Sequence, residues 1–262
     1  MRISPIWKLL LLAFAPITIW SRPFEIDQLA QSPGPAANAD SQEIAHLLAQ
    51  PYRYFGDGGQ SFVCFSADGK YVLKFFKRLD TNRHKQAQKW RRVVQSFQLA
   101  QERLAPESGL LYVHFQATQD LPQAFVVDVQ AAPMTLDLNK WDFVLQRRAV
   151  PTSEYLQALK AQGDLEGAKL ALKQLFDLSA QLYTKGVRNR DANFKSNTGF
   201  LDGKPLLIDV GRLTLCPKGG TKALHRKEVR RISQKFRSWL ETNYPELSPY
   251  FDELVEEILK KA

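Results

Sequence analysis

The chain has 262 residues, 44% hydrophobic and 24% charged, a composition typical of a globular protein and not of a disordered one. Its formal net charge of +9 favours anionic partners, such as nucleotide phosphates, nucleic acid, acidic protein or anionic lipid, without choosing among them. Two cysteines without C-x-x-C spacing and four scattered histidines argue against a disulfide framework and a Cys-rich zinc site.

Residues 1–23 form a separate segment in which Arg2 and Lys8 precede an apolar run over 9–20. This pattern is typical of a secretory signal or an N-terminal anchor, and it predicts an exported or membrane-associated protein. The alternatives are a mis-chosen start codon or an N-terminal core helix in a cytoplasmic protein. Residues 24–39 include the Pro- and Ala-rich stretch QSPGPAANA and are expected to form a linker.

The remaining residues, 40–262, are expected to form one folded domain. Asp40 and Glu43 fit the start of a helix. Strands are predicted over 52–65, interrupted by glycines, and over 70–76, with an Asp-Gly hairpin turn at 67–70. A long amphipathic helix over 84–104 and strands over 110–116, 124–129 and 141–146 follow.

After Pro151 the pattern changes from strands to helices, which are predicted over 153–160, 164–185, 222–242 and 248–261. Two short strands, 198–201 and 205–209, are joined by a second Asp-Gly turn. A β-rich part over about 40–146 and a mostly helical part over about 151–262 predict an α+β fold with two lobes that meet at a cleft near 146–151.

A glycine cluster, GDGGQSFV, lies at 56–63 between two predicted strands. Small residues in a hairpin let backbone N–H groups approach nucleotide phosphates closely. The candidate phosphate-binding residues are Gly56, Gly58, Gly59 and Ser61. Taken alone, such a cluster is also typical of an ordinary turn.

Lys74 lies within the apolar strand YVLKFF. Burying an unpaired ammonium group is expensive, so Lys74 is expected to have an anionic partner, such as phosphate oxygens and a carboxylate. Lys77 is the competing candidate, and a solvent-facing lysine is the structural alternative. Glu102 is the only carboxylate in the helix that follows and is therefore nominated as the partner of Lys74.

The most informative stretch is GVRNRDANFKSN at 186–197, which follows a long apolar helix and precedes a hairpin that ends in LIDVGR at 207–212. Together with the glycine hairpin and the lysine strand, it resembles the protein-kinase-like superfamily over most of 50–215. Asn189-Arg190-Asp191 takes the place of His-Arg-Asp, and Asp209-Val210-Gly211 takes the place of Asp-Phe-Gly.

The resemblance implies an ATP- and Mg²⁺-dependent phosphotransferase. Asp191 would orient or deprotonate the hydroxyl acceptor, Lys195 would stabilise the transferred phosphate, and Asp209 would hold Mg²⁺. Asn197 would be the second metal ligand, although it lies six residues after Asp191 where five is usual; Asn193 is the alternative.

Only 51 residues follow Gly211, and no Ala-Pro-Glu sequence occurs among them, so the long activation segment and large helical lobe of ordinary protein kinases do not fit. The chain is more similar to compact bacterial, small-molecule or lipid kinase-like proteins, and its acceptor is a small molecule, a lipid or a protein. The basic stretch 222–237 indicates a solvated helix face or a surface for anionic membrane, with nucleic acid less favoured. A pseudokinase that binds nucleotide or acts as a scaffold, and a basic membrane- or nucleic-acid-binding protein without catalysis, are the alternative functions.

Overall fold

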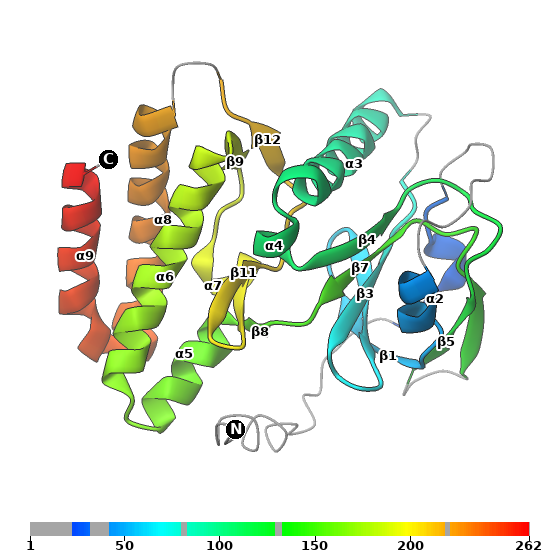
Figure 1. Cartoon of the computed structure of the whole chain (residues 1–262), viewed down its shortest axis with the longest axis horizontal. Coiled ribbons are helices and arrows are strands. Elements are labelled where there is room, and N and C mark those ends of the chain that lie inside the picture. The colour runs from blue at the N-terminus through cyan, green and yellow to red at the C-terminus, as the bar shows by residue number, and fades with distance from the viewer. Residues whose placement is uncertain (1–22, 32–41, 80–82, 129–132, 218–220, 262) are drawn as a thin grey trace.

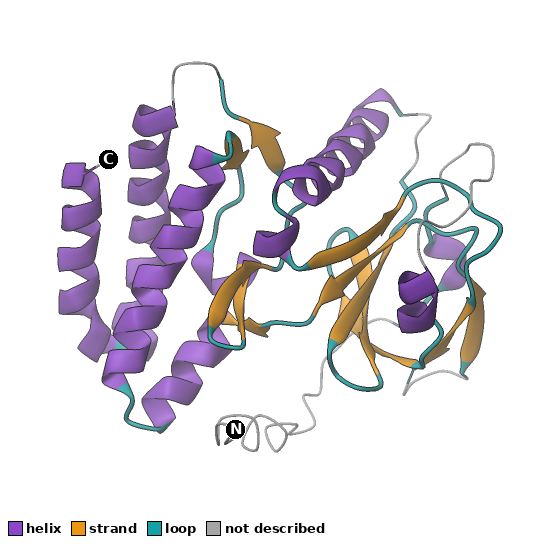
Figure 2. Cartoon of the chain, in the orientation of Figure 1, coloured by secondary structure: helices purple, strands orange, loops and turns teal. Residues whose placement is uncertain are grey.

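The computed structural model describes residues 23–31, 42–79, 83–128, 133–217 and 221–261. It has an α+β architecture, with a seven-stranded sheet on one side and a group of long helices on the other (Figures 1 and 2). The signal-like segment over 1–22 and the expected helix start at Asp40 lie outside the described residues. Within the part of the chain that the structure describes, no helix is both long enough and apolar enough to cross a membrane.

The large sheet has the strand order β4-β7-β3-β2-β1-β5-β6. Its strands are β1 (Tyr52–Asp57), β2 (Ser61–Ser66), β3 (Tyr71–Phe76), β4 (Leu110–His114), β5 (Gln123–Val127), β6 (Met134–Asp137) and β7 (Phe143–Arg147). All neighbouring strands are antiparallel except β1 and β5, which are parallel. The predicted strands are confirmed; β6 was not predicted, because four residues are too few for a clear alternation.

One face of this sheet forms an apolar core with helix α2 (Gln42–Leu48). Alternating burial along β1 places Tyr52 and Tyr54 in that core, as the period of two along a strand requires. Cys64 and Phe62 on β2 lie on the same face.

Residues 23–31 also belong to this core, so the expected linker over 24–39 is wrong in its first part. This stretch contains the short 3₁₀ helix η1 (Ile26–Gln28). Phe24 is 4% exposed and its ring contacts Tyr54 and Phe62. Its backbone N–H donates to Asp128, and Ala30 N donates to Phe76 O at 2.8 Å. The buried side chains of Phe24 and Leu29, together with the backbone hydrogen bond from Ala30 to β3, therefore make this segment part of the folded domain.

The opposite face of the sheet is covered by helix α3 (His84–Arg103), which is followed by the short helix α4 (Ala105–Ser108) (Figure 1). Val93, Phe97 and Ala100 recur at helical spacing and are buried. The same apolar cluster includes Leu178, Leu207 and Val210 from the second half of the chain. Helix α3 therefore packs against both halves of the molecule.

The second half is built around helix α6 (Leu165–Thr184), which packs with the other long helices in a second core. The other helices are α5 (Thr152–Ala161), α7 (Phe194–Asn197), α8 (Thr221–Asn243), the 3₁₀ helix η2 (Pro245–Leu247) and α9 (Ser248–Lys261). Short strands β8 (Val150–Pro151), β10 (Thr198–Leu201) and β11 (Lys204–Leu207) form a three-stranded sheet, and β9 (Val187–Asn189) pairs with β12 (Leu213–Leu215). The predicted long helices and the 198–209 hairpin are confirmed, while β8, β9, β12, α4 and α7 were not predicted, because each is short and, unlike the 198–209 hairpin, is not marked by an Asp-Gly turn.

We expect Phe24→Ala to lower the free energy of unfolding by about 3–5 kcal/mol, because it removes a buried ring from a packed core. Urea denaturation of the full chain measures this change. The matched control is Ile26→Ala, since Ile26 is 37% exposed and its truncation should have a small effect. Equal effects of the two substitutions would contradict the placement of residues 23–31 in the core.

Candidate functional site

The glycine cluster forms the turn between β1 and β2. Gly58 N donates to Ser61 O at 2.8 Å, which closes the turn. Lys77 holds the same turn from outside, with its ammonium group 2.5 Å from Asp57 Oδ2 and 2.9 Å from Gly58 O. Lys77 therefore has a structural role in the hairpin, which leaves Lys74 as the candidate for the phosphate-binding lysine.

Lys74 points from β3 toward the second half of the chain. Its Nζ donates to Gln146 Oε1 at 2.9 Å and to Ile208 O at 2.5 Å. Burial lowers the pKa of the Lys74 ammonium below the ordinary lysine value, and the Asp209 carboxylate opposes that shift. A partly desolvated cation thus lies close to the strand end that carries Asp209.

The nomination of Glu102 as the partner of Lys74 is wrong. The Glu102 side chain is 71% exposed, and its Oε1 lies 3.9 Å from Arg103 Nε. The face of α3 that packs inward carries Val93, Phe97 and Ala100. Glu102 is two residues beyond Ala100 and so points about 200° away from that face.

Two buried polar residues, Gln146 and Ser96, make the contacts that were expected of Glu102. Gln146 is the side-chain partner of Lys74, and Ser96 links α3 to the candidate site. Gln146 on β7 accepts from Lys74 and donates to Leu207 O at 2.9 Å and to Ser108 O at 2.5 Å. Ser96 on α3 donates to Val210 O and accepts from Leu213 N. The lysine is therefore positioned by the sheet, and α3 is attached to the backbone that follows Asp209.

The loop 189–197 follows β9 and is shaped by asparagine side chains. Asn189 accepts from Asp191 N at 2.9 Å, and Asn193 caps α7 by accepting from Lys195 N at 3.1 Å. Asn197 Nδ2 donates to Asp191 O at 2.6 Å. Because Asn193 is a helix cap, Asn197 is the better candidate of the two for a metal ligand.

Asn197 also joins this loop to the strand end at 207–209. Its carbonyl oxygen accepts from Ile208 N at 3.0 Å and from Asp209 N at 3.4 Å. The Asp209 side chain is exposed, and its Oδ1 accepts from Gly211 N at 2.9 Å. Asn197 thus bonds to the backbone of both Asp191 and Asp209.

The glycine hairpin closes the site from the other half of the chain. A Cβ atom added to Gly211 would lie 3.7 Å from Gln60 Oε1 and 3.3 Å from Asp209 Oδ1. Gln60 is in the turn between β1 and β2, so this turn lies next to the Asp209–Gly211 segment. Lys195 is exposed on α7, four residues beyond Asp191.

The residues present fit a magnesium ion that is bound together with phosphates. No group of three or more His, Cys, Asp or Glu side chains forms a metal cage in the described ranges. Mg²⁺ is usually held by only one or two carboxylates, with water and substrate phosphates completing its shell. Asp209 has a second carboxylate oxygen for such an ion, and Asn197 Oδ1 bonds only to the exposed Ser196 hydroxyl at 2.9 Å.

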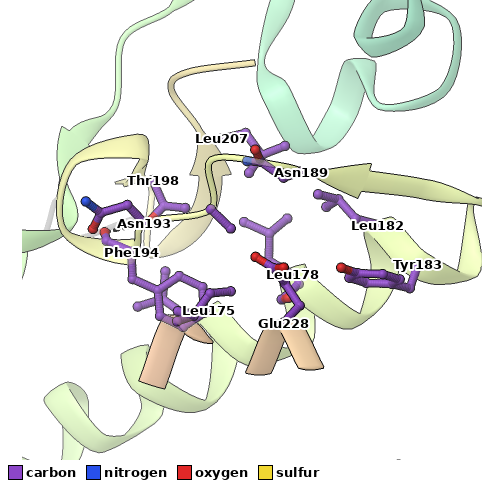
Figure 3. Close-up of a pocket in the computed structure, with 13 residues that line it drawn as sticks. Leu175, Leu178, Leu182, Tyr183, Asn189, Asn193, Phe194, Thr198, Leu207 and Glu228 are labelled. Atoms are coloured by element: carbon purple, nitrogen blue, oxygen red, sulfur yellow. Dashed lines mark hydrogen bonds between the residues drawn. The ribbon is translucent and has the colours of Figure 1, made fainter. Parts of the chain in front are cut away.

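Behind the loop, a small cavity of about 20 Å³ lies between α6, α7 and α8 (Figure 3). It has room for about one water molecule, so it cannot hold a nucleotide. Glu228 of α8 lines it and is 2% exposed, and Arg231 pairs with this buried carboxylate. Arg231 also donates to Ala192 O at 3.4 Å, next to Asp191. The basic helix therefore supports the loop from behind, while Arg226, Lys227 and Arg230 are exposed as expected for its solvated face.

Comparisons with known proteins found no close similarity to this chain. No protein-family model matches the chain, and no curated protein is similar to it. Among solved structures, the chain is similar to WbdD, with a TM-score of 0.42 and 16% sequence identity. The match covers 80% of this chain and 46% of that one, so the chain spans less than half the length of WbdD. A similarity at this level carries no argument about activity.

We expect Gln146→Leu to lower the free energy of unfolding by about 2–5 kcal/mol. The substitution leaves the buried carbonyl groups of Ser108 and Leu207 without a donor, at roughly 1–3 kcal/mol for each unsatisfied group. Urea denaturation measures the loss. Gln123→Leu on the exposed side of β5 is the control and should leave stability nearly unchanged; a similar loss in that variant would show that the loss is not specific to the Gln146 hydrogen bonds.

Proposed function

We propose that the chain is a divergent kinase-like phosphotransferase that moves the γ-phosphate of ATP to a hydroxyl group. The observation that carries the proposal is the position of Asn197, which bonds to the backbone of both Asp191 and Asp209. Lys74 adds a cation at the same place through its bond to Ile208 O. Two carboxylates and one partly desolvated lysine around a glycine turn are the parts that phosphoryl transfer requires.

The arrangement also supports a two-lobed, kinase-like division of the chain. The sheet over β1–β7 would be the first lobe and the helices from α5 onward the second. They meet where β7 leads into β8, at 147–150, close to the predicted boundary. The Lys74–Ile208 bond and the contact between Gln60 and the Gly211 position both cross this boundary.

In the proposed reaction, the acceptor oxygen forms a bond to the γ-phosphorus while the bond from that phosphorus to the β–γ bridging oxygen breaks. ADP leaves with the electron pair, and Asp191 accepts the hydroxyl proton. Lys74 binds phosphate oxygens, and the glycine turn supplies backbone N–H groups to them. Asp209 and Asn197 would hold Mg²⁺, which neutralises charge on the phosphates when it is bound.

A pseudokinase is the second candidate, and one specific feature favours it. The Lys74 ammonium group donates to an amide oxygen and a carbonyl oxygen rather than to a carboxylate. An uncharged partner holds a phosphate-binding lysine less firmly than a carboxylate would. In that case Mg²⁺-nucleotide would bind without transfer.

The charge of Lys74 predicts how nucleotide binding depends on pH. Lys74 is charged below its pKa, and burial lowers that pKa. The affinity for Mg·ADP should therefore fall as pH rises through the lowered value, earlier than an ordinary lysine would titrate. Lys74→Arg stays charged and should remove this fall.

Isothermal titration calorimetry across an alkaline pH series measures these affinities. Lys77→Arg is the matched control and should keep the wild-type profile, since Lys77 contacts Asp57 and the hairpin backbone. An unchanged profile in Lys74→Arg would show that Lys74 does not bind the phosphates.

We expect Asp191→Asn to lower phosphate transfer by about 10²–10⁴-fold while leaving Mg·ATP binding intact, because the amide cannot accept the proton. Asp209→Asn should instead weaken the Mg²⁺-dependent part of nucleotide binding. Transfer is followed with γ-labelled ATP and a panel of hydroxyl compounds, and binding by thermal shift.

The matched control is Asp202→Asn in the β10–β11 turn, where φ is +51° and asparagine is tolerated. Full activity of Asp191→Asn would remove Asp191 from the mechanism. Binding of Mg·ATP by the wild-type chain without transfer to any acceptor would favour the pseudokinase.

A further inference from the structure

Two exposed arginines, Arg190 and Arg212, lie where β9 ends and β12 begins. Strands β9 and β12 are antiparallel with Asn189 opposite Leu213, so Arg190 and Arg212 form the next opposed pair. Arg190 N donates to Arg212 O at 3.0 Å, which confirms the register. Directly opposed residues in an antiparallel pair project to the same face.

Arg190 and Arg212 bring two like charges to the same end of the strand pair, which an anion bound there would offset. Like charges directly opposite each other on two strands repel. Both arginine side chains are exposed, and Arg190 makes no ion pair with any residue in the described ranges. Lys195, on the helix that follows Asp191, adds a third exposed cation without an ion pair in the same part of the structure. The two carboxylates nearby, Asp191 and Asp209, already have roles in the proposed reaction.

Arg212 makes one ion pair, and it is with Asp191. Its Nε lies 3.8 Å from Asp191 Oδ2, and the two side chains are 59% and 46% exposed. An exposed pair at this distance contributes at most about 1 kcal/mol. It is therefore easily exchanged, although it occupies the carboxylate that would accept the hydroxyl proton.

We propose that the acceptor is a small hydroxyl compound that carries a carboxylate or a phosphate, and that Arg212 and Arg190 bind this anionic group. The inference rests on the proposed function, since it identifies the acceptor class at the same site. The planar guanidinium group can bind either anion through two parallel hydrogen bonds.

Binding of the acceptor then changes the partner of Arg212. The guanidinium group leaves Asp191 for the acceptor anion, and the freed carboxylate takes the hydroxyl proton as the oxygen attacks the γ-phosphorus. A neutral acceptor would leave Arg212 paired with Asp191. The move of Arg212 from Asp191 to the acceptor anion would thus both select an anionic acceptor and free Asp191 to accept the proton.

The nucleotide phosphates have a different set of cations. Lys74 and the glycine turn belong to the large sheet and approach the Asp209 segment from that sheet. Arg190 and Arg212 are turn residues next to the paired strands β9 and β12, in the second half of the chain, and Arg212 contacts Asp191. This separation assigns the arginines to the acceptor.

Three matched probes test the inference on the full-length protein: D-glycerate, glycerol 3-phosphate and glycerol. Ligand-observed NMR without nucleotide measures their binding. The two anions should bind at least about ten-fold more tightly than glycerol, and their relative affinities distinguish a carboxylate from a phosphate. Arg212→Gln and Arg190→Gln should each weaken anion binding several-fold, and Arg212→Lys should restore only part of it.

Arg91→Gln on the exposed face of α3 is the charge-matched control and should bind the probes like the wild type. Equal binding of glycerol and the anions, or undiminished anion binding by Arg212→Gln, would overturn the inference. It would also be overturned if Arg212→Gln weakened Mg·ADP binding and left D-glycerate binding unchanged, because Arg212 would then belong to the nucleotide.

A transfer assay with γ-labelled ATP separates this inference from the proposed function. Arg212-dependent anion binding without any Mg·ATP binding or transfer would refute the phosphotransferase and leave an anion site. Transfer to glycerol as efficient as transfer to the anionic probes would refute the anionic acceptor and leave the phosphotransferase.

Discussion

The burial of one ammonium group constrains much of this structure. Lys74 lies in an apolar strand, and its positive charge has to be compensated where it leaves the sheet. Its hydrogen bond to Ile208 O extends from β3 to the residue before Asp209 and so joins the two halves of the chain. Gln146, which is 2% exposed, holds the same ammonium group and ties it to Leu207 and Ser108. The strand that carries the lysine, the helix pair α3–α4 and the strand end that carries Asp209 are therefore fixed by one hydrogen-bond network.

Much of this arrangement could be predicted from the sequence, because the signals were local. Asp-Gly turns, alternating strands and helical apolar spacing located most of the long elements. Asp191, Asn197 and Asp209 were chosen as candidates from their order and spacing around the 198–209 hairpin, and their roles stay a prediction. The short strands β9 and β12 could not be predicted in this way, since three residues do not establish a period and their pairing joins segments far apart in the chain.

The contacts of the site were harder to predict than its elements. Glu102 was nominated by charge alone, but helical geometry directs it to solvent. Gln146 was overlooked because a neutral amide in an apolar strand gives no charge signal, although a polar residue in such a strand needs partners. Residues 24–31 were predicted to belong to a linker that continues into a Pro- and Ala-rich stretch. In the structure, the side chains of Phe24 and Leu29 are buried in the core instead.

The attachment of α3 has a consequence for how such a protein would be controlled. Ser96 fixes this helix to the backbone at Val210 and Leu213, and Gln146 rather than a residue of α3 holds Lys74. In the described residues, α3 is thus already fixed to both halves of the chain. In the proposed phosphotransferase, Lys74 would therefore keep its partner without any movement of this helix.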